Sequence, residues 1–121
     1  MIKNILLVGL GGSIGSMGRY LVSHFMKPGS FPWATLTVNI TGSFIIGIIF
    51  ALAARDEYFS QNWRLFLAAG ICGGFTTFSA FSAENLLLLQ QGKYLVAGGY
   101  ILLSVVSGIL AAWIGFKTFA S

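Results

Sequence analysis

The side chains of this sequence that could do chemistry are hydroxyl, amide and aromatic groups, with one carboxyl group, set inside apolar segments. They fall on three stripes at helical spacing: Thr35, Asn39 and Ser43; Thr77, Phe81 and Glu84, with Phe78 beside them; and Tyr100, Ser104 and Ser107 or Gly108. Polar groups in hydrocarbon need hydrogen-bond partners, and one such stripe is explained equally well by contacts that join neighbouring helices. Three stripes from three segments favour a hydrophilic path between the helices.

The groups on these stripes favour an anion as the cargo of that path. Only one acid, Glu84, falls within an apolar segment, and it lies toward an end. A cation path or a proton-coupled exporter usually has a carboxylate near the middle of the membrane. The donors are the amide of Asn39, hydroxyl groups and the guanidinium of Arg19. The positive ring edges of Phe78 and Phe81 are suited to an anion, with ordinary packing as the alternative.

The stretch GGFTTFSAF (residues 73–81) interrupts the third apolar segment. We expect the helix to break at Gly73 and Gly74, which frees backbone carbonyl and amide groups. Free carbonyl groups in the middle of a membrane are suited to binding a monovalent cation. The alternative is a simple glycine kink in a packed bundle.

The composition places the whole chain in a membrane. Of its 121 residues, 56% are hydrophobic and 8% are charged, and the mean hydropathy is +0.85. Soluble domains carry about 25% charged residues. A membrane-spanning helix needs about 20 apolar residues. We therefore predict an all-α, multi-pass membrane protein, a single domain over 1–121 in contact with lipid, with spans at about 4–26, 33–54, 63–91 and 94–118.

Neither an enzyme nor a nucleic-acid-binding protein is predicted. The single histidine, His24, lies near the end of a span, without a nucleophile–base pair or a metal-ligand cluster. Cys72 stands alone in an apolar run, where it is expected to act as a small packing residue. The net charge is +4, but the seven basic residues are spread singly along the chain, so no patch for nucleic acid is present.

The placement of the basic residues predicts no single orientation in the membrane. With four spans, both termini and the loop after the second span share one side, which holds Lys3, Arg55, Arg64 and Lys117. The other side holds Lys27 and Lys93, with Arg19 about two turns inside the span. Orientation follows an excess of Lys and Arg on one side, so this small excess predicts insertion both ways. Two oppositely inserted copies can pair about an axis in the membrane plane.

Close packing of helices is predicted by small residues at a spacing of four. The pairs are Gly11 and Gly15, Ser43 and Gly47, Ser104 and Gly108, and Ala111 and Gly115. Small residues let helix backbones approach each other where lipid supplies no hydrophobic drive. The pattern is common in membrane proteins and identifies no function by itself.

Four pieces of the sequence together resemble the Fluc, or CrcB, family of fluoride channels over nearly the whole chain. They are GGSIGSMGRY (11–20), FPWATLTVNITGSFIIG (31–47), GICGGFTTFSAFSAE (70–84) and YILLSVVSG (100–108). The resemblance implies a dual-topology, antiparallel homodimer in a bacterial-type cytoplasmic membrane. It also implies two pores for passive fluoride efflux and a structural sodium ion (Na+) at the dimer interface.

The resemblance assigns roles to individual residues. Along the fluoride path it places Asn39 as the amide donor, Phe78 and Phe81 as ring edges, and a hydroxyl track of Thr77, Ser79, Tyr100 and Ser104. The sodium ligands that it implies are the backbone carbonyl groups of Gly73 and Thr76. Arg19 and Glu84 match positions near the vestibules. Where many members carry another serine one turn beyond Ser104, this chain has Gly108, with Ser107 beside it.

Two other functions remain as alternatives. A small multidrug exporter has a similar size and also inserts both ways, but it uses a carboxylate in the first span to exchange protons for cationic drugs. The first span of this chain has no Asp or Glu. The second alternative is a membrane scaffold that transports nothing and is held together by small-residue packing. Measurement of fluoride flux separates the channel from both.

Overall fold

The structure is a computed structural model that describes residues 1–26, 29, 31–55 and 61–120. Lys27, which contributes to the predicted charge balance, lies outside the described residues. The helices are α1 (Ile2–Phe25), α2 (Trp33–Arg55), α3 (Gln61–Arg64), the π-helix η1 (Leu65–Cys72), α4 (Gly73–Phe75), α5 (Phe78–Gln90) and α6 (Tyr94–Ala120).

Four stretches of the described chain are long and apolar enough to cross a membrane. They are Ile2–Phe25, Trp33–Arg55, Gln61–Gln90 and Tyr94–Ala120. The predicted spans agree with these bounds to within two residues at every end. Helices are expected here because lipid offers no partner to a backbone N–H or C=O group, and a helix satisfies nearly all of them internally.

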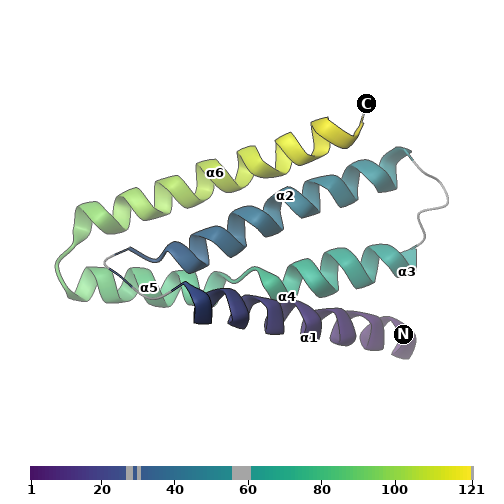
Figure 1. The fold of residues 1–121 in the computed structure, drawn as a ribbon, viewed down its shortest axis with the longest axis horizontal. Coiled ribbons are helices and arrows are strands. Elements are labelled where there is room, and N and C mark those ends of the chain that lie inside the picture. Colours follow the sequence, from purple (N-terminus) through teal and green to yellow (C-terminus); the bar gives the residue numbers. More distant parts are fainter. Residues whose placement is uncertain (27–28, 30, 56–60, 121) are drawn as a thin grey trace.

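The spans alternate in direction, so both termini lie at the same end of the bundle (Figure 1). That end also holds the close of α2 and the start of α3. Figure 1 shows α6 beside α2, with the third span following and α1 on its other side. This arrangement confirms the four alternating spans on which the charge comparison depends.

Glycines bring neighbouring helices into close contact. Between α1 and the third span, a Cβ atom added to Gly70 would lie only 2.9 Å from the Cα atom of Gly11. Between α2 and α6, a Cβ on Gly47 would overlap the backbone carbonyl of Ala112, and one on Gly115 would overlap the opposite backbone. The predicted small-residue packing is therefore present within the chain.

Large apolar side chains cover the outside of the bundle. Ile2 is 76% exposed and Leu95 is 93% exposed. A buried cluster forms from Leu36, Leu88, Ala97 and Tyr100, at the end of the bundle where α5 meets α6. Such a distribution suits a chain whose outer surface faces lipid, because lipid is as apolar as the side chains themselves.

The third span is broken, as predicted, but the expected position of the break was wrong. Gly73 has φ −62° and ψ −37°, which is helical, and Gly74 lies in the helical turn α4. The extended residues are Thr76, with φ −85° and ψ 158°, and Thr77, with φ −149° and ψ 122°.

The packing of Gly74 explains why the helix does not break there. A Cβ on Gly74 would lie 2.9 Å from the Cα atom of Gly12 on α1, so this glycine permits a close contact and not a bend. A glycine can permit either a bend in a helix or a close contact between helices, and only the packing distinguishes the two. The π-helix η1 leads directly into this region, and π-helical turns are frequent near functional sites.

Candidate functional site

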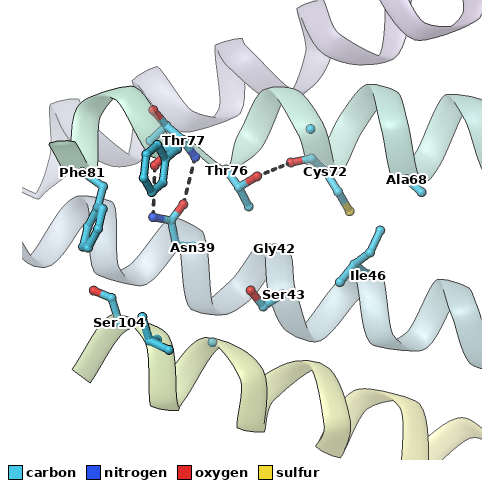
Figure 2. Close-up of a pocket in the computed structure, with 14 residues that line it drawn as sticks. Asn39, Gly42, Ser43, Ile46, Ala68, Cys72, Thr76, Thr77, Phe81 and Ser104 are labelled. Atoms are coloured by element: carbon cyan, nitrogen blue, oxygen red, sulfur yellow. Dashed lines mark hydrogen bonds between the residues drawn. The ribbon is translucent and has the colours of Figure 1, made fainter. Parts of the chain in front are cut away.

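A groove of about 430 Å³ lies between α2, α6 and the broken third span (Figure 2). Seven of the residues predicted from the sequence line it: Asn39, Gly73, Thr76, Thr77, Phe78, Phe81 and Ser104. Figure 2 shows Asn39, Thr77, Phe81 and Ser104 toward one end and Ile46, Ala68 and Cys72 toward the other. The structure thus brings together the polar stripes of three spans.

Four of the predicted residues lie outside the lining of this groove: Ser79, Tyr100, Arg19 and Glu84. Ser79 is exposed, and its hydroxyl lies 3.4 Å from that of Thr77. Tyr100 is fully buried, with its ring centroid 5.0 Å from that of Phe81. Ser79 and Tyr100 thus adjoin the groove through Thr77 and Phe81, and a direct role in the path stays a prediction for each.

Asn39 meets the third span at its break. Its Nδ2 donates to the carbonyl oxygen of Thr77 at 3.2 Å, and its Oδ1 accepts from the N–H of Thr77 at 2.9 Å. These two bonds fix which side-chain atom is nitrogen and which is oxygen. A primary amide has two N–H groups, so one remains for a further acceptor.

The break leaves several carbonyl groups without their helical donors, among them those of Gly73 and Thr76. In a continuous α-helix, the carbonyl of Gly73 accepts from residue 77 and that of Thr76 accepts from residue 80. Here the N–H of Thr77 bonds to Asn39, and the N–H of Ala80 bonds to the Thr77 side chain at 3.1 Å. Thr77 is the N-cap of α5. Freed carbonyl oxygens are suited to a hard cation.

Arg19 satisfies the carbonyl group of Gly74, which also loses its helical donor at the break. Its Nε donates to the carbonyl oxygen of Gly74 at 3.1 Å. In a continuous helix that carbonyl would accept from Phe78, which begins α5 beyond the break. Arg19 therefore supports the broken helix from α1.

Two aromatic rings form a wall at one end of the groove, and a third ring packs behind them. The ring centroids of Phe78 and Phe81 lie 5.8 Å apart at an interplanar angle of 44°, and Phe81 contacts Tyr100 in turn. Phe78 is 78% exposed, whereas Phe81 is half-buried. Both phenylalanines line the groove, so their rings are available to an ion within it.

Behind this wall, Glu84 accepts two hydroxyl hydrogen bonds. Tyr100 donates to its Oε1 at 2.8 Å, and Thr35 donates to its Oε2 at 2.6 Å. Thr35 and Glu84 also line a second cavity, of about 470 Å³, at the end of the bundle where α5 meets α6. The spacing of Thr35 and Asn39 signalled a shared stripe, but nothing in the sequence paired Thr35 with Glu84.

The groove also holds residues to which the sequence gave no individual role. Ser43 lines it one turn beyond Asn39, on the same predicted stripe, and the stripe was the available signal. Gly42 lies where a Cβ would overlap the Cγ2 atom of Thr76, so a side chain there would push the broken segment away. No sequence pattern identified this contact.

Known proteins resemble this chain over most of its length. Residues 6–116 match the family model described as CrcB-like protein, Camphor Resistance (CrcB). The chain is 47% identical over 116 residues to a protein of Leptospira interrogans serogroup Icterohaemorrhagiae serovar copenhageni. This alignment covers 93% of this chain and 91% of the relative. It is 48% identical over 114 residues to a protein of Chlorobium chlorochromatii, covering 93% and 88%. Both relatives are named fluoride-specific ion channel FluC.

Proposed function

Because this chain belongs to the CrcB family, whose curated relatives are named fluoride-specific ion channels, we propose that it is a fluoride-selective channel of the cell membrane. It gives fluoride a passive route out of the cell and so lowers fluoride in the cytoplasm. The route that we propose is the groove between α2, α6 and the broken third span.

The observation that carries this proposal is the kind of group that lines the groove. The described lining offers the amide of Asn39, the hydroxyl of Ser104 and the ring of Phe81, and it contains no Lys or Arg. A channel must bind an ion well enough to replace its water, yet loosely enough to release it. Several modest donors meet both demands for a small, strongly hydrated anion, whereas a fixed cation would hold it.

The direction of flow follows from weak-acid chemistry. Hydrogen fluoride crosses membranes from acid surroundings and dissociates in a neutral cytoplasm. A membrane potential that is negative inside favours exit of the anion by about 2.3 kcal/mol per charge for each 100 mV. A passive pore therefore suffices, without a proton-coupled carboxylate or an enzymatic step.

We further propose that two chains pair in opposite orientations and enclose two pores. Phe78 supports this proposal, because its ring lines the groove but is 78% exposed in a single chain. A partner chain would cover the exposed side of this ring and close the ion path. The exposed backbone of Gly73 on the same groove supports it too. The nearly even spread of basic residues allows both orientations.

A sodium ion at the dimer interface is the remaining part of the proposal. The carbonyl groups of Gly73 and Thr76 fit such an ion, because the break has directed their helical donors to Asn39 and Thr77. One copy supplies two oxygen ligands in this way, and two copies supply four. The ion would fix the two broken helices against each other, so its role is structural.

Efflux from liposomes tests the channel function. Purified protein is reconstituted into liposomes loaded with potassium fluoride, valinomycin is added to release potassium, and external fluoride is followed with an electrode. We expect rapid release of fluoride, and retention of chloride in matched liposomes loaded with potassium chloride. Retention of both anions would favour the scaffold, and cationic-drug transport driven by protons would favour the exporter.

A further inference from the structure

The hydroxyl groups that α6 presents to the groove stop after one residue. Ser104 lines the groove, and its Oγ is buried without a hydrogen-bond partner among the described residues. One turn on, Gly108 also lines the groove but has no side chain. Buried hydroxyl groups are normally bonded, so the Ser104 hydroxyl is free for an acceptor that enters the groove. Among the residues of α6 that line the groove, none after Ser104 carries a side-chain donor.

Helix α2 fills the gap that Gly108 leaves. A Cβ atom built on Gly108 would lie 3.6 Å from the Oγ of Ser43. The Ser43 hydroxyl thus lies beside the space that a hydroxyl at residue 108 would occupy. Ser43 lines the same groove, and Figure 2 draws no hydrogen bond from it to another lining residue.

Ser107, the neighbour of Gly108 in the sequence, does not take this place. Its hydroxyl donates to the carbonyl of Leu103 in its own helix, and it is not among the residues that line the groove. A hydroxyl bonded in this way has its proton engaged already. The nearest replacement for the absent side-chain donor therefore comes from α2.

From these contacts we infer that Ser43 is a fluoride-binding residue, and that its hydroxyl takes over the role that a serine at residue 108 would have. The inference rests on the proposed channel function and names one more ligand of the same path. Residues 104 and 108 are one turn apart, about 6 Å along α6. A fluoride ion that leaves Ser104 and moves one turn along α6 therefore meets the Ser43 hydroxyl beside Gly108.

A rescue experiment tests the inference in the liposome assay. Ser43→Ala removes the donor, and we expect fluoride efflux to slow about fivefold, as the loss of one neutral hydrogen bond predicts. Gly108→Ser in the Ser43→Ala background returns a hydroxyl from α6, for which the 3.6 Å separation leaves room. We expect the double variant to recover most of the rate. Ser107→Ala is the matched control and should leave efflux unchanged.

Each outcome decides for or against Ser43. Wild-type rates in Ser43→Ala, or a double variant as slow as Ser43→Ala, would overturn the inference. Ser43→Cys controls for misfolding, because cysteine keeps the size of the side chain but is a weak hydrogen-bond donor. We expect slow fluoride efflux from this variant. Efflux at the wild-type rate would also count against the inference. If the unsubstituted protein releases no fluoride, the proposed channel function fails instead.

Discussion

The side-chain amide of Asn39 binds both backbone polar groups of Thr77, accepting from its N–H at 2.9 Å and donating to its carbonyl at 3.2 Å. A backbone opened inside a membrane must find such partners, because lipid supplies none. Asn39 thereby links α2 to the break in the third span. Its unused N–H remains available to an ion in the groove.

Asn39→Asp is expected to abolish fluoride efflux, leaving the rate of protein-free liposomes. A carboxylate can still accept from the N–H of Thr77, but it cannot donate to the Thr77 carbonyl, and it places a negative charge beside the path. Asn62→Asp is the control, since Asn62 is exposed on α3. Normal efflux from a well-assembled Asn39→Asp variant would remove Asn39 from the path.

Phe78→Ile and Phe81→Ile are each expected to slow efflux, by roughly two- to tenfold if a ring edge contributes as much as other aromatic contacts do. Each change keeps an apolar side chain and removes the positive edge. Phe50→Ile, on the exposed face of α2, should have no effect; Phe50 is 55% exposed. The liposome assay measures the rates, and size-exclusion chromatography checks assembly. Unchanged efflux after loss of both rings would refute the edge-on contact.

Tyr100→Phe is expected to lower the free energy of unfolding by about 1–3 kcal/mol, because it removes one of two hydroxyl donors to a part-buried carboxyl group. The bond in question joins the Tyr100 hydroxyl to Glu84 at 2.8 Å. Unfolding in detergent measures the change, and a double-mutant cycle with Glu84→Gln isolates the pair. Tyr94→Phe, at an exposed tyrosine of α6, should leave stability unaltered. Additive effects of the two changes would show that the bond contributes nothing.

Replacement of sodium by a larger cation is expected to weaken the dimer, if carbonyl oxygens of Gly73 and Thr76 hold the ion. Thr77→Ala should raise the sodium concentration needed for dimerisation, because the N–H of Ala80 then loses its bond to the Thr77 hydroxyl and returns to the Thr76 carbonyl. Thr77→Ser keeps the capping hydroxyl and serves as the control. Sedimentation at graded sodium concentrations gives the dimer fraction. A dimer that is indifferent to the cation would speak against this site.

The membrane setting and the four spans follow from the amino-acid sequence alone. Composition decides the first, because so few charged residues cannot cover a soluble protein. Lipid decides the second, because each apolar run must close its own hydrogen bonds as a helix. The stripe through Asn39 and Ser43 could also be predicted from the sequence, because helical spacing puts residues four apart on one face.

Only the packing of the helices shows which of their faces meet and at which positions along the helix axes. Periodicity within one helix says nothing about its register against the next, so the bond between Asn39 and Thr77 could not be read from the sequence, nor could the contact between Gly74 and Gly12. The approach of Ser43 to Gly108 depends likewise on how closely α2 and α6 pack at their glycines. Local sequence sets the helices, and close packing between them sets the site.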